Sequence, residues 1–520
     1  MGRAAAVAGV LAAGMALAVG EAVAAVTGGP SLVVVVGDVV VDLAPGWLVL
    51  RTIDLLGTTQ KPALLIGIVV VTLLAGGALC CNVGGGRRTG RAAFVAFGLV
   101  GSGAAAWSGA PIRGLATGLV AASVGIAVLE AGLRRVPVSG LPPNDPAIDP
   151  PTAVPLEDPR VKATTRRGFI TYAAGVSVAV GAVAVGSRAL ARRGTDGLRA
   201  QVVLPSTRRP ATTTTTTEGP WPPMPGLSRW VTPNDDFYRI DTALVVPRVD
   251  PGTWSMTIGG LVDRPLRFAL DDLLGMDLVD AAVTLSCVSN EVGGSLVGNA
   301  VWMGVPLVDL LAEAGPTTGA EQVMAWSVDG FNAGFPMMAV LDGRTALVAV
   351  GMNGEPLPYR HGFPARLVVA GLYGYVSAVK WLDRIQLTTL DDDGYWIPRG
   401  WAKYGPIKIA SRIDVPVGSA VPAGRQPIAG VAWAPVSGVG GVEVSVDDGP
   451  WTACRLLQRS APGRPGDSWV QWFLAWDAEP GAHVLRVRAH DTDGRVQPPG
   501  PKPIAPDGAE GYHTRLIRAA

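Results

Sequence analysis

At 520 residues the chain exceeds the usual size of one domain, about 100–200 residues, so at least two globular units are expected. Its formal charge of +1 lacks the strongly basic balance that nucleic-acid binding requires. The sequence has four cysteines and no CxxC, CxxCH or HExxH, which excludes a disulfide framework and the common zinc and c-type haem motifs.

The first 190 residues differ in composition from the rest of the chain. They are rich in Ala, Val, Gly and Leu, whereas 13 of the 15 Trp and all four His lie beyond residue 220. Apolar segments of roughly 18–23 residues, the length that crosses a bilayer, occur at 4–26, 62–80, 92–109, 114–133 and 169–190. We therefore predict a multi-helix membrane region at 1–135 and a last transmembrane helix at 169–190.

A further apolar stretch, 31–56, is interrupted by three Asp, an Arg and a Pro. Uncompensated charge at the centre of a bilayer is costly, so this stretch is either re-entrant or a functional span. Basic clusters at 87–91 and 134–167 place both connections on the cytoplasmic side under the positive-inside rule, and the last helix then exits outward. If the N-terminus is cytoplasmic, this arrangement needs an even number of crossings before residue 140. Four crossings satisfy that condition and five do not, which favours the interpretation that 31–56 does not span the membrane.

Two polar segments flank the last helix. The predicted cytoplasmic loop, 136–168, contains Arg166-Arg167-Gly168, which resembles a twin-arginine export signal. The motif alone is explained equally well by the basic residues that usually flank a transmembrane helix on its cytoplasmic side. After the helix, residues 191–225 contain six consecutive Thr and many Pro. Such a composition cannot bury a core, so we predict a semi-extended linker there.

Two folded domains are predicted in the remaining sequence. At 226–412, short Val, Leu and Ile runs between Gly and Pro indicate strands, with helices at 269–275 and 305–314, so the first domain is α+β. From 413 to 520 the pattern changes to alternating strands such as 442–446 and 483–488. This pattern predicts an immunoglobulin-like β-sandwich.

Cys287 carries the strongest chemical signal. An apolar, β-branched strand delivers it into a polar, Gly-rich loop, the kind of place where binding and catalytic side chains concentrate. A thiolate presented in this way suits a metal or a nucleophilic role. The alternatives are a buried structural cysteine and a protease-like nucleophile with His361 as its base.

Six motifs of the soluble half resemble those of the sulfite-oxidase superfamily of molybdopterin enzymes. They read TPNDDFYR (232–239), TLSCVSN (284–290), WMGVPL (302–307), MNGEPLP (352–358), HGFPAR (361–366) and GYVSAVKWL (374–382). Each is weak alone, but six in order are specific, and the resemblance runs from about residue 225 to the C-terminus. It implies a sulfite-oxidase-type molybdopterin domain at 226–412, a dimerisation domain at 413–520, Mo-molybdopterin as cofactor and Cys287 as the metal ligand.

The resemblance also implies which residues contact the cofactor: Asn234, Phe237, Tyr238, Arg239, Asp329, His361, Arg366, Ser377, Ala378, Val379 and Lys380. Arg366 and Lys380 suit a terminal phosphate as a bidentate donor and a point charge, although surface ion pairs would explain the same residues. Tyr395, in an acidic turn, falls where the family has an active-site tyrosine. Tyr404 is the competing candidate.

The chain departs from the family pattern after Cys287. Sulfite oxidases of animals and plants carry basic residues there, whereas this chain has Glu291 and no Arg. A carboxylate opposes anion binding, which puts sulfite in doubt as the substrate. The chain also shares features with sulfoxide-reducing relatives, which act on neutral sulfoxides but usually lack the sandwich.

We therefore expect a two-electron oxygen-atom transfer on a small sulfur compound, a protein sulfoxide or a similar heteroatom compound, outside the cytoplasmic membrane. Because all four His lie in the soluble half, the spans supply no His to a haem, and a separate partner must carry the electrons. Further expected partners are membrane lipid and a second copy of the chain. A cofactor inserted in the cytoplasm requires export of a folded domain, which favours the twin-arginine interpretation. The alternatives are an inactive, membrane-anchored binding module and a transporter or sensor with an appended domain.

Overall fold

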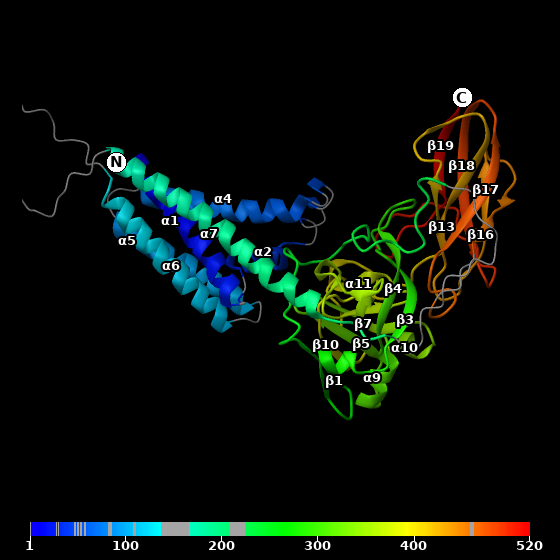
Figure 1. The fold of residues 1–520 in the computed structure, drawn as a ribbon, viewed down its shortest axis with the longest axis horizontal. Coiled ribbons are helices and arrows are strands. Elements are labelled where there is room, and N and C mark those ends of the chain that lie inside the picture. Colours follow the sequence, from blue (N-terminus) through cyan, green and yellow to red (C-terminus); the bar gives the residue numbers. More distant parts are fainter. Residues whose placement is uncertain are drawn as a thin grey trace, which may run out of the picture. The chain divides into compact units, whose positions relative to one another are not determined.

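The computed structural model describes residues 2–27, 29, 31–45, 48, 51–52, 55–56, 59–81, 86–107, 111–136, 166–206, 224–457 and 462–520. They form two compact units, Met1–Asp196 and Gly197–Ala520 (Figure 1). The predicted cytoplasmic loop, apart from its ends, and residues 207–223 of the predicted linker lie outside the described residues.

The first unit is helical. Its elements are α1 (Gly2–Thr27), α2 (Leu32–Leu43), α4 (Gln60–Cys81), α5 (Gly86–Trp107), α6 (Pro111–Leu133) and most of α7 (Arg166–Gln201). Among the described residues, four stretches are long and apolar enough to cross a membrane: Arg3–Thr27, Gln60–Cys80, Ile112–Leu133 and Arg167–Ser187. The predicted span at 92–109 lies largely in α5, which is not one of these four because Arg91, Ser102 and several Gly lower its hydropathy.

Two helices differ in length from a simple span. α2, inside the charged stretch 31–56, has 12 residues, fewer than the roughly 20 that a crossing needs. α7 has 36 residues and continues past the predicted end at 190. The Arg, Ala and Leu residues that follow the apolar stretch favour a helix, although they are too polar for a membrane. Residues 191–201 of the predicted linker are therefore helical.

Two β-sheets build the α+β part of the second unit. Their strand orders are β2-β1-β10-β5-β6 and β3-β4-β7-β8, with β9 paired to β7. The strands are β1 (Ser255–Gly260), β2 (Leu266–Ala269), β3 (Val279–Ser286), β4 (Val297–Pro306), β5 (Gln322–Ser327), β6 (Asn332–Pro336), β7 (Ala346–Met352), β8 (Glu355–Pro356), β9 (Arg366–Val369) and β10 (Leu382–Thr388). Apolar side chains of both sheets, such as Ile385 of β10 and Val348 of β7, pack in one core.

Short helices connect these strands. α8 (Leu270–Leu274) and α9 (Leu307–Ala314) confirm the helices predicted at 269–275 and 305–314. α10 (Met338–Leu341) and α11 (Gly374–Ser377) are single turns. These elements position three of the predicted site residues. Cys287 directly follows β3, Arg366 is the first residue of β9, and Lys380 lies shortly after α11.

The C-terminal part of the second unit is β-rich. Its strands are β11 (Ala410–Val415), β12 (Ala420–Val421), β13 (Gly424–Trp433), β14 (Val439–Val446), β15 (Thr452–Ala453), β16 (Arg455–Leu457), β17 (Val470–Ala478), β18 (Gly481–Asp491) and β19 (His513–Ala519). They form two sheets, β11-β13-β17-β16 and β12-β19-β18-β14-β15. Trp472 of the first sheet and Val444 and Leu485 of the second share one apolar core. The strands predicted at 442–446 and 483–488 lie in β14 and β18.

The strand that leads to Cys287 is covered by a loop of this β-rich part. β3 is at the edge of its sheet, and its free backbone groups donate from Ala282 N to Pro462 O at 2.8 Å and from Thr284 N to Asp467 O at 2.9 Å. The hydroxyl of Thr284 accepts from Trp469 N at 2.7 Å. These bonds satisfy an edge that would otherwise offer unpaired groups to solvent or to another chain.

Candidate cofactor site

Cys287 follows β3 directly and is fixed by its own loop. Its N–H donates to Leu296 O at 2.9 Å, and its carbonyl accepts from Asn290 N at 3.0 Å. The Asn290 side chain accepts from Leu296 N at 2.8 Å and closes the loop. The thiol is free and buried, and burial raises its pKa, whereas the backbone and hydroxyl of Ser289 hydrogen-bond to it and act in the opposite direction. The strand and loop therefore hold one thiol at a defined position with donors at its sulfur.

Aromatic side chains of the 232–239 motif line the space beside this thiol. Phe237 contacts the ring of Trp302 edge-on, with ring centroids 5.7 Å apart, and His361 at 5.6 Å. Tyr238 stacks on Phe237 at 5.3 Å. Burial, together with the charge of Cys287, raises the pKa of the Tyr238 hydroxyl, which therefore stays neutral.

Arg366 is a buried cation. Its Nη1 donates to His361 O at 3.1 Å and its Nε to Leu367 O at 3.3 Å, while the guanidinium lies 4.9 Å from the Trp302 ring centroid. Burial lowers its pKa to about 10, and Tyr238 opposes that shift. In the part of the chain that the structure describes, no Asp or Glu forms a salt bridge with it. A buried cation without a carboxylate partner is costly unless an anion completes the site.

Lys380 and Arg239 share one carboxylate. The Lys380 Nζ lies 2.8 Å from Asp241 Oδ2, and the Arg239 Nε donates to the same oxygen at 2.7 Å. Burial lowers the pKa of Lys380 to about 8, and Asp241 opposes this shift. Asp329 faces the same pair, and burial raises its pKa. The group contains two cations and two carboxylates, so with Arg366 the site keeps an excess of positive charge.

His361 is neutral and connects two of the predicted segments. Its Nε2 lies 2.8 Å from Asn234 O. Burial lowers its pKa to about 3, and the cations Arg366 and Lys380 shift it in the same direction. The side chain of Asn234 accepts from Asn353 Nδ2 at 2.8 Å and donates to Glu355. The 352–358 motif therefore positions the 232–239 motif.

The turn from Ser377 to Lys380 is held by backbone contacts. The Ser377 hydroxyl donates to Tyr373 O at 3.1 Å, Ala378 N donates to Gly374 O at 3.0 Å, and Val379 O accepts from Leu367 N at 2.9 Å. Gly362 lies beneath it with φ of 109°, and a Cβ there would meet the Cβ atoms of Arg366 and Lys380 at 3.0 and 3.1 Å. Only glycine combines this backbone conformation with such a close approach.

The tyrosines divide into two groups. Tyr373 lies near enough to Cys287 for the two charges to interact, and burial raises its pKa to about 12. Tyr395 is in an aromatic cluster in which the Arg399 guanidinium lies 3.6 Å from its ring centroid. Tyr404, the competing candidate, is 54% exposed. Tyr395 therefore stays a prediction, and Tyr238 and Tyr373 are the tyrosines whose ionisation is coupled to Cys287.

Four residues of the site were not predicted from the sequence: Ser289, Asp241, Asn353 and Glu355. Ser289, Asn353 and Glu355 stand inside motifs that resemble the family. The partner of Asn353 and Glu355, Asn234, is distant in sequence, whereas Ser289 acts on Cys287 two residues before it. Asp241 follows the 232–239 motif by two residues. A carboxylate so close to a predicted cation is the only sequence signal that could have indicated it.

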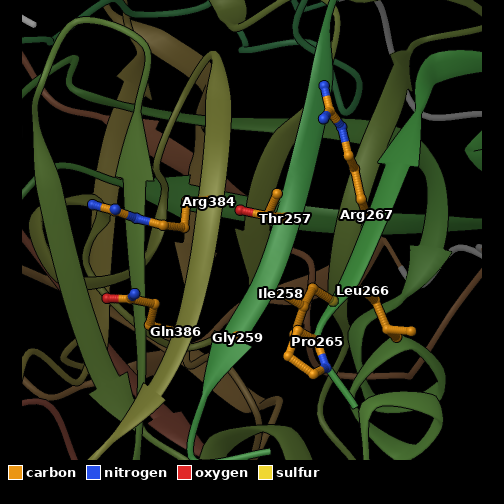
Figure 2. Close-up of a pocket in the computed structure, with 8 residues that line it drawn as sticks. All are labelled: Thr257, Ile258, Gly259, Pro265, Leu266, Arg267, Arg384 and Gln386. Carbon is orange, nitrogen blue, oxygen red and sulfur yellow. The ribbon is translucent and has the colours of Figure 1, made fainter.

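A separate pocket of about 320 Å³ lies on the outer face of the five-stranded sheet that contains β1 and β10 (Figure 2). It is lined by Thr257, Ile258, Gly259, Pro265, Leu266, Arg267, Arg384 and Gln386. Arg267 and Arg384 point in different directions, so their guanidinium groups do not converge on one ligand (Figure 2). The pocket contains none of the predicted site residues.

Two side chains of the β-rich part hold the loop after Cys287. Arg412 of β11 donates from Nη1 to Gly294 O at 2.7 Å. His513, the first residue of β19, packs against Gly293, where a Cβ would lie 2.4 Å from the ring. The shape of this loop therefore depends on both parts of the second unit.

We expect the free energy of unfolding of the second unit to fall as the pH drops from about 6.5 towards 4. Burial lowers the pKa of His513 to about 4, Arg515 and Arg412 lower it in the same direction, and Asp414 opposes them. Between these values the unfolded chain binds the proton and the native chain does not, so the stability contributed by His513 is present above pH 6.5 and is lost as the pH falls through the folded pKa.

Denaturant unfolding between pH 4 and 7 checks this expectation. His513→Gln should remove a pH-dependent loss of the order of 2 kcal/mol, reduced from the full shift because the ring is partly exposed. His483→Gln is the control of opposite sign, because Asp447 raises the pKa of His483. An unchanged pH profile in His513→Gln would contradict the assignment.

Comparisons with known proteins identify relatives of the second unit. Residues 243–396 match the family described as oxidoreductase molybdopterin binding domain. Mitochondrial sulfite oxidase of Homo sapiens is 30% identical over 332 residues, which cover 54% of this chain and 60% of that protein. Sulfite oxidase of Arabidopsis thaliana is 31% identical over 341 residues, covering 53% and 85%. The solved structure of the sulfane dehydrogenase SoxCD from Paracoccus pantotrophus is 26% identical, covers 56% of this chain and 82% of that chain, and gives a TM-score of 0.49.

Fold and sequence together define a chain that carries an oxidoreductase molybdopterin binding domain. The chain belongs to the sulfite-oxidase superfamily of molybdopterin enzymes. It spans 60% of the length of the mitochondrial sulfite oxidases that it matches.

The residues present fit Mo-molybdopterin. A free, buried thiol is available as a ligand at Cys287. Arg366 supplies a buried positive charge without a carboxylate partner among the described residues, which suits an anionic cofactor. The described residues contain no group of three or more His, Cys, Asp or Glu able to hold a metal by themselves.

Proposed function

We propose that this enzyme performs a two-electron oxygen-atom transfer on a sulfur compound or a similar heteroatom compound, with Cys287 as the protein ligand to molybdenum. One observation carries the proposal: a free, buried thiol directly after β3 and the buried cation Arg366, the first residue of β9, are placed by strands of one sheet. The molybdenum cofactor supplies the redox chemistry when bound. The protein places one thiolate, excludes water from it and presents cations to the anionic part of the cofactor.

The residues divide by role. Arg366, Arg239 and Lys380 would hold the phosphate of the cofactor, and Asp241 and Asp329 limit the mutual repulsion of these cations. Neutral His361 and the backbone of the 377–380 turn offer hydrogen bonds to the polar rings, as do Asn234 and the backbone around it. Ser289 donates to the Cys287 sulfur, which tunes a thiolate ligand. On the substrate side we place Tyr395, from its position in the motif order.

A neutral substrate fits the loop after Cys287 better than sulfite does. Glu291 is exposed in this loop, and residues 288–296 contain no Arg or Lys. Arg412, which donates to Gly294 O, is already paired with Asp414 at 2.7 Å. An anion would therefore meet a carboxylate and no free guanidinium in this segment, which disfavours its binding.

We place the catalytic unit outside the cytoplasmic membrane, anchored by the apolar helices. The four apolar stretches and the basic connections support this topology. Arg167 and Gly168, the described end of the twin-arginine-like motif, stand at the start of α7. Because every His lies beyond residue 220, electrons leave through a separate protein or a diffusible carrier. The β-rich part, as an immunoglobulin-like sandwich, would pair two copies of the chain.

The test uses the full-length protein, purified in detergent from a host that makes the cofactor. Molybdenum by plasma mass spectrometry and fluorescence of the oxidised pterin should each give about one per chain. Turnover with artificial electron carriers should then be faster with neutral thioethers or sulfoxides than with sulfite. Faster turnover of sulfite would overturn the substrate assignment. Molybdenum and pterin without turnover of any of them would favour the inactive binding module.

A further inference from the structure

The last turn of α7 lies in the second unit and contacts the hairpin of β7 and β8. Arg199 donates from Nε to Leu357 O at 2.9 Å and from Nη2 to Glu355 Oε2 at 3.1 Å. Pro356 O accepts from the same Nη2. The side chain is 25% exposed. One guanidinium therefore bonds three successive residues of the hairpin, which is more specific than an ordinary surface ion pair.

The hairpin of β7 and β8 connects Arg199 to Asn234, a predicted cofactor contact. Glu355 uses its other carboxylate oxygen, Oε1, to accept from Asn234 Nδ2. Asn353, on the same hairpin, donates to Asn234 Oδ1 at 2.8 Å. The Asn234 carbonyl in turn lies 2.8 Å from His361 Nε2. Hydrogen bonds therefore connect Arg199 to the buried site through two side chains.

The residues after α7 strengthen this attachment. Val202 and Leu204 pack against the apolar core of the α+β part. At Gly351 of β7 a Cβ would lie only 2.8 Å from Leu204 Cδ1. The segment that follows α7 is therefore also held to the α+β part by apolar packing, which does not depend on the ion pair of Arg199 and Glu355.

We propose that Arg199 is a positioning residue for the cofactor site, so that the last turn of α7 is a structural part of that site. The inference rests on the proposed function, because it takes Asn234 as a cofactor contact. Arg199 holds the Glu355 carboxylate in place through a charge-assisted bond, and Glu355 holds the Asn234 amide. Without Arg199, Glu355 keeps no cationic partner among the described residues, so one of the contacts that hold the Asn234 amide is weakened, while the bond from Asn353 remains.

The expected effect is on cofactor retention. In full-length protein purified in detergent with its cofactor, Arg199→Met should release pterin about ten times faster than wild type, the factor that one lost interaction of this kind produces. The release is followed by pterin fluorescence after dilution, with molybdenum per chain measured alongside. Glu355→Gln weakens the same connection from the hairpin side and leaves the sequence of α7 unchanged. The double variant should release pterin no faster than the stronger single variant, because both act through one pair.

Arg264→Met is the matched control. This arginine also donates to a backbone carbonyl, that of Glu313, and its side chain is away from the predicted site residues. It should release pterin at the wild-type rate. Equal release by Arg199→Met and wild type would overturn the inference, as would a loss in Arg199→Met that Glu355→Gln does not reproduce. Absence of molybdenum from wild type would instead contradict the proposed function.

Discussion

Replacing Cys287 with Ser should reduce turnover by at least about 1000-fold, roughly 4 kcal/mol of barrier, and leave the fold intact. The buried thiol that follows β3 is the proposed molybdenum ligand, and a hydroxyl is a poor substitute for a thiolate on a metal that prefers soft ligands. Because Arg366, Lys380 and Asn234 remain, pterin should be retained in large part.

Turnover with an artificial carrier, molybdenum content and pterin fluorescence together measure this effect. Cys454→Ser is the matched control, because Cys454 is also a free thiol whose pKa burial raises to about 12, but it lies in the β-rich part. It should keep wild-type turnover. Activity of Cys287→Ser within tenfold of wild type would exclude Cys287 as the essential ligand.

Replacing Arg366 with Met should leave the chain largely without cofactor. The guanidinium is the buried positive charge that no carboxylate neutralises in the described residues, so an anionic cofactor gains more from it than from the paired Lys380. Loss of such a buried, charge-assisted contact costs roughly 3–5 kcal/mol, which corresponds to a weakening of binding by about 100-fold to several thousand-fold.

Arg384→Met is a close control for this substitution. Its guanidinium also lies over a tryptophan, 4.4 Å from the Trp326 ring centroid, but on the outer face of the sheet next to the separate pocket (Figure 2). Molybdenum and pterin per chain should fall in Arg366→Met and stay near one in Arg384→Met. If the apo form of Arg366→Met is more stable than wild-type apo protein, the buried charge is confirmed as a cost that the cofactor offsets; equal cofactor content in both variants would contradict its role.

Local patterns predicted what lies close together in the sequence. The strand before Cys287, the helices at 269–275 and 305–314 and the strands at 442–446 and 483–488 all depend on short-range periodicity, and the structure contains each of them. The cofactor was predicted from the resemblance to the family, because six motifs in the same order are specific, whereas a single cysteine is not.

Contacts between distant segments were not predictable in this way. The bond between Glu355 and Asn234 joins residues 121 positions apart, and that between Lys380 and Asp241 joins residues 139 apart. The predicted length of α7 was also too short. Hydropathy identifies the apolar stretch, but it does not show where the helix ends when Arg and Ala residues continue it. For α5 the hydropathy was overestimated instead. The predicted span does form a helix, but the Gly, Ser and Arg residues of this helix make it less apolar than the other predicted spans.

The loop that covers the edge of β3 has a consequence for how the second unit unfolds. Composition places a boundary at residue 412, but the strand before Cys287 donates hydrogen bonds to Pro462 O and Asp467 O and accepts one from Trp469 N, on the other side of that boundary. The two parts should therefore melt in a single cooperative transition, since loosening the later part uncovers the strand that leads to Cys287. A gene fusion or truncation that separates them at 412 would divide one thermodynamic domain.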